Sequence, residues 1–416
     1  MTSRKLQTIS RKAVDRLFKW ETDIGKNSGK HSVEVLDLFS GCGGLSLGFD
    51  AVSGPGSKVR IAGAVDKNPI ALESYKRSLG GETFCTDIRV LEETPKVFED
   101  FKNKVGFSKK LPLVIVGGPP CQGFSAHRKK SWDKPDSRND LLIVFARLAL
   151  RLNADAIVME NVPEIFSKKY WDYFTITREL LIKNGYVVKQ KIYNCAGFGV
   201  PQERFRAVVI AMKKNFLMPV PFLPSTKYRT VREAIAMLPP VSPGSANPSD
   251  YLHRCAAHRK STIDVIKSVP TNGGSRPSGI GPKCLDRVKG FYDVYGRLHW
   301  DRPSITITHY ARNPASGRFT HPEQNRGLTA REAARLQGFP DSFFFNGDFD
   351  TIFSQIGEAV PPPLAAGIAA TVLYFLTNET KPCETTDEND LISGPISNSF
   401  GSVIAGIKGK DRAFKS

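Results

Sequence analysis

The sequence predicts an α/β fold, in which an open sheet domain is followed by a smaller and more irregular domain. Two apolar runs, residues 33–39 and 113–116, have the composition of buried strands and lead into glycines. The first continues into an apolar helix start, the strand–turn–helix order of a nucleotide-type cofactor site. Near residue 213 the composition shifts toward proline, glycine, serine and arginine, which marks the irregular domain.

The composition favours a polyanionic partner. The 416 residues are enough for two domains, and the net charge is +18. Such an excess of lysine and arginine favours nucleic acid first and an anionic membrane surface second, although a merely soluble basic protein stays open. No apolar run reaches the ~20 residues needed to span a bilayer. We therefore expect no membrane partner.

The cysteines argue against a structural metal site. All seven are scattered without a CxxC pair, which disfavours both a zinc site and a disulfide framework and favours a reducing cytoplasm. His253, Cys255 and His258 form one local trio, but no fourth ligand stands at a familiar spacing. We expect no metal.

The first 30 residues are basic and lack the apolar core of a secretory signal. Leu6, Ile9, Val14 and Leu17 give a faint helical spacing. Either a short basic helix on nucleic acid or a solvated leader fits, and the leader is favoured.

The cofactor site is predicted at the ends of the first strands. Gly41, Gly43 and Gly44 form the first turn, although the strict GxGxxG pattern is absent. The second strand ends in Asp66, where a carboxylate can accept hydrogen bonds from ribose hydroxyls. Its alternative role is a helix N-cap, because Asn68 and a proline follow. Asp87 is a second carboxylate at a strand end.

The loop at residues 117–125 presents one reactive side chain, the thiol of Cys121. Pro119 and Pro120 stiffen its approach, and glycines on either side let the backbone come close to a substrate. We take Cys121 as a candidate nucleophile, against the alternative of a buried, inert cysteine. The basic segment 127–134 is a candidate to close over a phosphate backbone.

Three further side chains follow in later strands. Glu160 ends the strand 156–159, where a carboxyl with a raised pKa can hold a proton; its alternative role is an N-cap. Arg204 and Arg206 stand two residues apart, so a strand would point both to one face. Their alternative role is contact with phosphate alone.

These segments resemble the DNA (cytosine-5)-methyltransferase family across residues 33–378, in that family's motif order. One departure is that the family usually has Asn after the last motif's glycine, where this chain has Glu358. The matching motifs are 37–44, the Pro-Pro-Cys-Gln of 119–122, the Glu-Asn-Val of 160–162, Gln202 with Arg204 and Arg206, 302–306, and 355–357.

The resemblance implies a Rossmann-like S-adenosylmethionine-dependent sheet domain and a target-recognition domain that reads double-stranded DNA. Cys121 would add to C6 of a flipped-out cytosine, so that C5 accepts the methyl group. Glu160 would hold N3 and the exocyclic amine, and Arg206, with Arg204 nearby, the O2 atom. S-adenosylhomocysteine would be the product.

The resemblance also implies which residues hold the cofactor. The glycine turn would hold the methionine end, Asp66 the ribose hydroxyls, and Asp87 with Ile88 the adenine. The full expected set is Asp37, Phe39, Ser40, Gly41, Gly43, Gly44, Asp66, Asp87, Ile88, Pro119 and Leu141.

The expected organisation places most of the DNA contacts in the second domain, and each could equally be a phosphate anchor. The candidates are Ser125, His127, Arg128, Arg276, Arg287, Arg297, His299 and Arg312. The expected parts are a basic leader (1–32), a catalytic domain (33–212, completed by 350–378), a target-recognition domain (213–322), a hinge segment (323–349) and a polar tail (379–416).

The family analogy places this enzyme in a bacterial restriction–modification system, as a cytoplasmic, nucleoid-associated monomer. A companion endonuclease would act on the same site without direct contact. An orphan or regulatory methylase fits the residues equally well. A transfer RNA methyltransferase is disfavoured because Gly123, and not proline, follows Gln122.

Three other classes fit less well. A catalytically silent DNA-binding relative would have lost Cys121 or Glu160. A dehydrogenase would carry the strict glycine fingerprint. Gly118 and Cys121 exclude the pattern of adenine-N6 and cytosine-N4 methylases.

Overall fold

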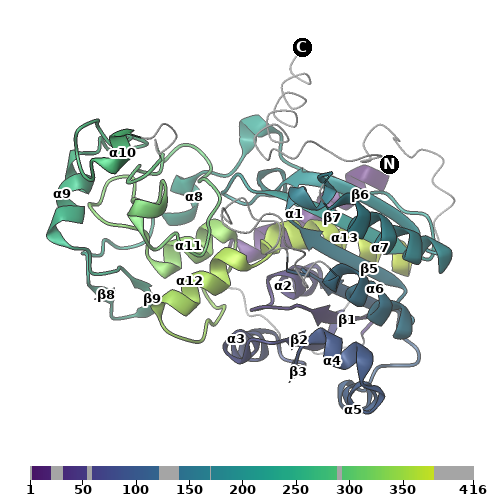
Figure 1. Ribbon diagram of the computed structural model, residues 1–416. Helices are drawn as coiled ribbons and strands as arrows, with labels where there is room; N and C mark the ends of the chain where they lie inside the picture. Colours follow the sequence, from purple (N-terminus) through teal and green to yellow (C-terminus); the bar gives the residue numbers. More distant parts are fainter. Residues whose placement is uncertain are drawn as a thin grey trace.

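The computed structural model describes residues 2–19, 31–53, 59–120, 140–168, 170–287 and 293–378. A sheet domain lies on the right of Figure 1, and a smaller domain with short elements lies on the left. The strands of the large sheet are β1 (Val33–Leu38), β2 (Val59–Asp66), β3 (Glu82–Cys85), β4 (Leu113–Gly117), β5 (Ala156–Asn161), β6 (Val187–Asn194) and β7 (Phe205–Met212).

The strand order of this sheet brings the expected site loops to one edge. The order is β3-β2-β1-β4-β5-β7-β6. The first five of these strands run parallel, and β7 is antiparallel to both β5 and β6. Leu38 lies opposite both Val65 and Gly117. The loops after β1, β2 and β4 therefore leave the sheet at the same level, where ligands bind in open α/β folds.

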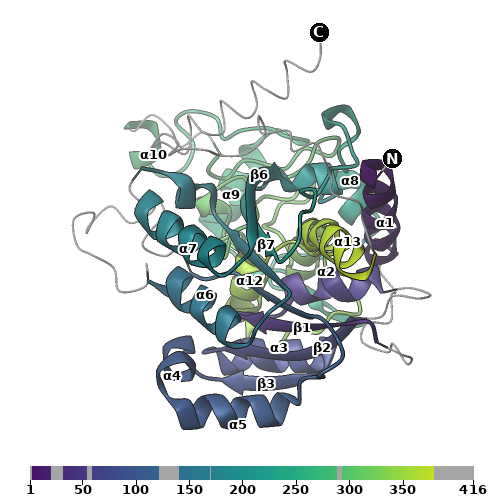
Figure 2. The ribbon, with the colours of Figure 1, turned by 90° about the vertical axis from the view of Figure 1, so that its right-hand side faces the viewer.

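Helices cover both faces of the sheet, as Figure 2 shows. Successive side chains of β1 point to opposite faces of the sheet, so that Val35 lies in one apolar core and Leu36 in another. One core contains α1 (Thr2–Leu17), α2 (Gly44–Val52), α3 (Pro69–Leu79) and α13 (Pro362–Thr377). The other contains α4 (Ile88–Glu93), α5 (Pro95–Val105), α6 (Leu141–Arg151) and α7 (Trp171–Lys183). The predicted α/β fold is confirmed.

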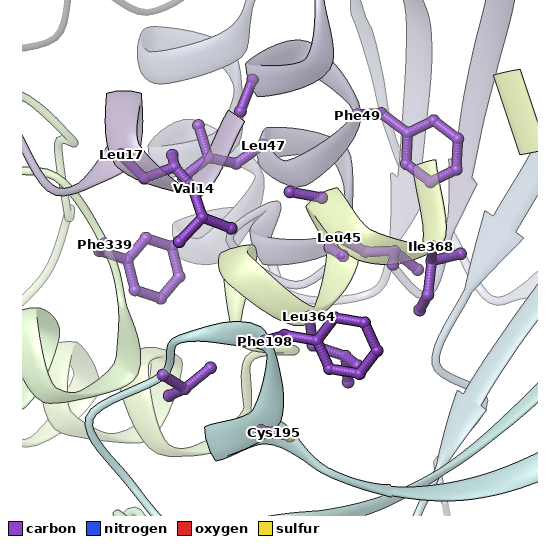
Figure 3. Close-up of a cluster of buried hydrophobic side chains, with 14 of the residues drawn as sticks. Val14, Leu17, Leu45, Leu47, Phe49, Cys195, Phe198, Phe339, Leu364 and Ile368 are labelled. Atoms are coloured by element: carbon purple, nitrogen blue, oxygen red, sulfur yellow. The ribbon is translucent and has the colours of Figure 1, made fainter. Parts of the chain in front are cut away.

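The solvated leader expected at the N-terminus is wrong for residues 2–17. These residues form α1, whose Leu6, Val14 and Leu17 are buried. Arg16 also donates hydrogen bonds to the backbone carbonyls of Ala51 and Ser53 at the end of α2. Figure 3 shows α1 side chains beside those of α2 and α13. The helix is amphipathic, so its basic residues lie outside while its apolar stripe completes the core.

The second half of the chain consists mainly of short elements. Within the described residues these are α8 (Val231–Ile235), α9 (Lys260–Ser268), α10 (Cys284–Arg287), α11 (Ala330–Gln337), α12 (Phe349–Glu358), the two-stranded sheet of β8 (Ala246–Asn247) and β9 (Asp250–Arg254), and the 3₁₀ turns η3 (Ser225–Lys227) and η4 (Pro314–Ser316). Two further 3₁₀ turns, η1 (Pro163–Phe166) and η2 (Cys195–Phe198), lie in the sheet domain.

Helix α11 is held by buried ion pairs. At its start, Thr329 and Glu332 form a reciprocal capping box. Glu332 also pairs with buried Arg326 at 2.7 Å. On the same helix, Arg331 pairs with Asp250 of β9 at 2.6 Å. The ion pair between Arg331 and Asp250 therefore connects α11 to the small sheet of β8 and β9.

One stretch of the described chain, Phe349–Thr377, is long and apolar enough to cross a membrane by length and composition alone. Most of it is buried inside the protein. Its second part is α13, which packs so closely on α2 that a Cβ on Gly48 would lie 2.3 Å from Ala365.

Replacing Leu17 by alanine should lower the free energy of unfolding by about 2–5 kcal/mol, because the side chain is fully buried against the core. Urea unfolding measures the change. Lys12→Ala, on the exposed face of α1, is the matched control and should change it by less than about 0.5 kcal/mol. If both substitutions have equally small effects, residues 2–17 act as the solvated leader that the sequence favoured.

Candidate active site

The glycine turn after β1 is closely packed on one side and open on the other. A Cβ on Gly43 would lie 2.6 Å from the Leu79 side chain, and one on Gly44 would lie 2.2 Å from the Val360 carbonyl oxygen. A Cβ on Gly41 would meet no atom of the described residues within 4 Å. Phe39 adopts a left-handed φ of 62°, which few residues other than glycine do. The turn is therefore pressed against α3 and the chain after α12, with one side free for a ligand.

Asp66 stands at the end of β2 beside this turn. Its carboxylate accepts hydrogen bonds from the backbone N–H groups of Gly41 at 2.9 Å and Asn68 at 2.8 Å. The N-cap of α3 is Asn68, which accepts from Ile70 and Ala71, so the alternative role of Asp66 as that N-cap is wrong. Asp66 remains half-buried. The predicted ribose contact stays a prediction.

Asp87 and Ile88 begin α4. The exposed Asp87 is the N-cap of that helix and accepts from the Arg89 N–H at 2.9 Å, whereas Ile88 is buried. Leu141, also buried, begins α6. These positions lie after β3 and β4, and their predicted contacts with the cofactor are not tested by the fold.

Asp37 lies beneath the turn and does not face its open side. It is 1% exposed and accepts a hydrogen bond of 2.6 Å from the Ser46 hydroxyl, which in turn accepts one from Tyr75. Burial raises the pKa of Asp37 to about 7. The expected direct contact of Asp37 with a cofactor is therefore wrong, because its carboxyl group is used to support the turn.

The loop after β4 starts beside Glu160. The Asn161 side chain donates a 3.1 Å hydrogen bond to the carbonyl oxygen of Pro119. A Cβ on Gly118 would lie 3.7 Å from Glu160 Oε2. Gly118 therefore lies next to the carboxyl group, at a distance that would also leave room for a Cβ. The predicted residues Cys121, Ser125, His127 and Arg128 lie outside the described residues.

Glu160 and Arg206 form a buried ion pair at the ends of β5 and β7. Arg206 Nε lies 2.8 Å from Glu160 Oε1, and the two side chains are 13% and 10% exposed. Burial raises the pKa of Glu160, opposed by the charges of Arg206 and Arg204. Glu164 of η1 also has a raised pKa through burial, and Arg206 opposes this shift too. An acid with a raised pKa is suited to hold a proton on a substrate.

Arg204 is used differently from Arg206. It is 2% exposed and donates to the carbonyl oxygens of Ile307 at 2.8 Å and Gly357 at 2.9 Å. Gln202 accepts from the Ile307 N–H at 2.8 Å. These carbonyls accept hydrogen bonds from the two Nη atoms of Arg204, and its predicted place in the catalytic set, near Arg206, stays a prediction. Arg204 also positions the segments around Ile307 and Gly357.

Two of the expected DNA contacts are internal. Arg297 is 1% exposed, and its guanidinium donates to the carbonyl oxygens of Val269 and Ile266, both at 2.9 Å. The Arg276 side chain is 7% exposed and pairs with Asp286 at 2.8 Å. Direct contact with DNA by either residue is wrong, because each guanidinium is already bound inside the second domain.

The other expected contacts remain predictions. Arg312 is partly exposed and pairs with Asp350 of α12 at 2.6 Å. Arg287 is exposed, and half-buried His299 accepts from the Asp301 N–H.

The local trio of possible metal ligands is used within the protein. His253 contacts Thr329 and the Pro239 carbonyl, and His258 accepts from the Gly327 N–H at 3.0 Å. Cys255 lies 3.7 Å from His258. Across the described ranges, no group of three or more His, Cys, Asp or Glu side chains could hold a metal ion.

The sequence did not predict several residues that support the site. Ser46 and Tyr75 hold Asp37, and Cys195 is buried near the Glu160–Arg206 pair, where burial raises the pKa of its thiol to about 12. Nothing local marks Ser46 or Tyr75, because their partner is remote in the chain. Cys195 could have been noticed only because it stands shortly before the Gln202 motif.

Solved structures share this fold. A prophage-encoded protein of E. coli, assigned as a DNA modification methyltransferase, matches with a TM-score of 0.63 and 25% identity, over 84% of this chain and 100% of that one. The Dnmt2 methyltransferase of S. pombe matches with a TM-score of 0.55 and 19% identity, over 83% and 100%. The fold is that of DNA methyltransferases.

Sequence comparisons then define the family. Residues 33–373 match C-5 cytosine-specific DNA methylase. The type II methyltransferase M1.HphI of Haemophilus parahaemolyticus is 35% identical over 84% of this chain and 88% of its own length. The type II methyltransferase M1.BsuMI of Bacillus subtilis is 33% identical over 80% and 79%. The chain belongs to the C-5 cytosine-specific DNA methylase family and is a DNA (cytosine-5)-methyltransferase.

Asp37→Asn should make the free energy of unfolding less dependent on pH between about 4 and 7. The folded protein holds the Asp37 proton with a pKa of about 7, against 3.8 ordinarily. The wild type therefore loses stability as pH rises through this window, by roughly 4 kcal/mol for a difference of about 3 pKa units. Urea unfolding at pH 4.5 and 7.5 measures the slope.

The control for this pH experiment is Asp100→Asn, which removes an exposed carboxyl from α5. It should keep the wild-type slope. A wild-type slope in Asp37→Asn as well would mean that Asp37 ionises in the folded protein as it does in water.

Arg297→Met should destabilise the protein without changing how salt affects DNA binding. Its removal leaves buried carbonyls unpaired, at a cost of about 3 kcal/mol or more. Thermal unfolding and DNA titrations over a range of salt concentrations measure both effects. Arg287→Met, at an exposed position, is the control for stability. A salt slope reduced by about one in Arg297→Met would instead indicate a lost phosphate contact.

Proposed function

We propose that this enzyme transfers a methyl group from S-adenosylmethionine to C5 of a flipped-out cytosine in double-stranded DNA, through a covalent bond between Cys121 and C6. The observation that carries the proposal is the Glu160–Arg206 pair, 2.8 Å apart and buried. It lies beside Gly118, three residues before Cys121 in the chain.

The pair supports the addition of a thiolate to the ring. When the Cys121 sulfur bonds to C6, electrons move toward N3 and C5 of the cytosine. Glu160, with its raised pKa, supplies the proton at N3, and Arg206 holds the O2 atom. C5 then takes the methyl group from the sulfonium, which leaves as the thioether. A water molecule removes the C5 proton, the electrons of that C–H bond form the C5–C6 double bond and expel the Cys121 thiolate, and N3 returns its proton to Glu160.

The residues at the neighbouring strand ends fit S-adenosylmethionine, which supplies the electrophilic methyl group when bound. The open side of the turn at Gly41 leaves room for the methionine end. Asp66 lies next along the sheet edge, for the ribose hydroxyls, and Asp87 after it, for the adenine. This linear order supports the assignment of Phe39, Ser40, Gly43 and Gly44 to the cofactor site.

A base inside the duplex cannot reach Cys121, so the target cytosine must flip out of the helix. Unstacking one base costs a few kcal/mol. In this proposal the basic segment 127–134 closes behind the flipped base, and the net charge of +18 gives salt-dependent affinity for phosphates. Residues 213–322 read the target sequence, with Arg287, His299 and Arg312 as the contacts that remain open.

The biological setting is proposed from the relatives. M1.HphI and M1.BsuMI are named type II methyltransferases. The enzyme would then act as a cytoplasmic monomer at the nucleoid and protect host DNA from an endonuclease that cuts the same site.

The test is transfer of labelled methyl from S-adenosylmethionine to double-stranded DNA, with transfer RNA in parallel. Cys121→Ala should abolish transfer, because the alanine side chain has no thiol to add to C6. Glu160→Gln should lower kcat by about 10²–10⁴-fold, since the amide cannot donate an acidic proton to N3. Mapping of the labelled cytosines identifies the target site.

Labelling of transfer RNA alone would overturn the DNA assignment. Wild-type protein that binds DNA without transferring methyl would indicate a silent DNA-binding relative. Full transfer by Cys121→Ala would exclude the covalent route.

A further inference from the structure

The outer side of α1 carries a row of cations. Four exposed residues follow the side of the helix opposite its buried stripe, and we call them the α1 basic face: Arg4, Lys5, Arg11 and Lys12. The one acid of the helix, Asp15, pairs with Arg229 at 2.9 Å. Within the described residues, none of the four cations forms a salt bridge. This face therefore attracts an anionic partner.

The α1 basic face is held in a fixed position. Gln7 donates a 2.8 Å hydrogen bond to the Pro221 carbonyl oxygen, and Arg11 donates one of 3.1 Å to that of Phe222. The helix lies along α13, on the side of the sheet away from α6 and α7 (Figure 2). Because α1 is already ordered, a partner that binds to it does not bear the entropic cost of forming the helix.

The end of α13 lies beside the first turn of α1. The Lys5 ammonium lies 5.8 Å from the centre of the Tyr374 ring, in the last turn of α13. Lys214 Nζ lies 3.4 Å from the carbonyl oxygen of Asn378, the C-cap of that helix. The chain after Asn378 therefore starts next to the α1 basic face.

The segment that starts there is acidic. Residues 379–390, which lie outside the described ranges, have five carboxylates and one lysine, a net charge of −4. Residues 2–19 have six cations and one carboxylate, a net charge of +5. The nine residues from Asn378 to Asp387 can extend up to about 30 Å. Since α1 is about 24 Å long, these carboxylates can reach any part of its outer face.

We propose that the acidic segment 384–390 docks on the α1 basic face. Its carboxylates pair with the guanidinium and ammonium groups of the helix. Single surface ion pairs are weak and screened by salt, so the contact depends on several pairs together. The same cations would otherwise attract DNA phosphates, so the docked segment shields this face from nucleic acid. The contact involves no residue of the methyl-transfer site and does not depend on the proposed reaction.

The first test is carbodiimide coupling in the full chain, which joins a carboxylate directly to a lysine amine. Mass mapping of the peptides should find segment 384–390 bonded to Lys5 or Lys12. Because salt screens the contact, the yield should fall at least about threefold in roughly 0.5 M salt. Lys183, exposed at the end of α7 on the other core, is the control and should give less than about a tenth of that yield.

The second test measures the shielding with a duplex of A·T pairs only, which contains no cytosine. Asp387→Asn combined with Glu388→Gln should strengthen its binding about threefold or more at low salt. Asp172→Asn with Glu179→Gln removes two exposed charges from α7, changes the net charge equally, and should have the smaller effect. Adding Lys5→Gln and Lys12→Gln to the first variant should abolish its gain.

Four results would overturn the inference. Equal coupling of the segment to Lys183 and to the α1 lysines would mean that it has no preferred partner. If the segment does not couple to α1 and the A·T duplex protects Lys5 and Lys12 in the wild type, the face binds nucleic acid instead. Equal gains in the two charge-matched variants would show an effect of net charge alone. Unchanged duplex binding by all variants, with thermal unfolding showing each to be folded, would exclude the shielding.

Discussion

The buried hydrogen bonds of Gln202 and Arg204 hold the separate parts of the site together. Burying a guanidinium is costly unless its donors are satisfied. Here the carbonyl oxygens of Ile307 and Gly357, from segments more than a hundred residues further along the chain, accept those bonds. Satisfying Arg204 therefore requires the second domain and α12 to meet the sheet edge in one arrangement. The position of Glu358 beside the glycine turn follows from this arrangement.

Charge is distributed unevenly along the sheet edge. Asp66 ends β2 and Asp87 follows β3, whereas the β5–β7 side carries Arg206 beside Glu160. The acidic side suits a cofactor with two cationic centres, and the arginine side suits an electron-rich base ring. The two reactants can thus meet over β4, where the loop toward Cys121 begins.

Local sequence was sufficient to predict the sheet, the glycine turn and Glu160, because each depends on a strand and the few residues after it. Local sequence was insufficient to predict the roles of the buried arginines. Arg297 stands in a basic, glycine-rich segment that resembles a nucleic-acid contact, yet remote carbonyls of Val269 and Ile266 bind it. Asp37 failed for the same reason, since Ser46 and Tyr75 become its neighbours only after folding. The burial of α1 was missed because its apolar stripe is short and its partner α13 lies near the other end of the chain.

The packing of α13 has a consequence for how the protein is made. Helices α1 and α2 leave the ribosome first, but α13, which covers them, is synthesised after residue 361. Until then the apolar residues of α1 and α2 lack the cover that α13 supplies, and a nascent chain in that state is prone to aggregate. The half of the core that contains the glycine turn is completed last. Chains truncated before α13 would therefore be expected to depend on chaperones, although they contain all the residues that we assign to the chemistry.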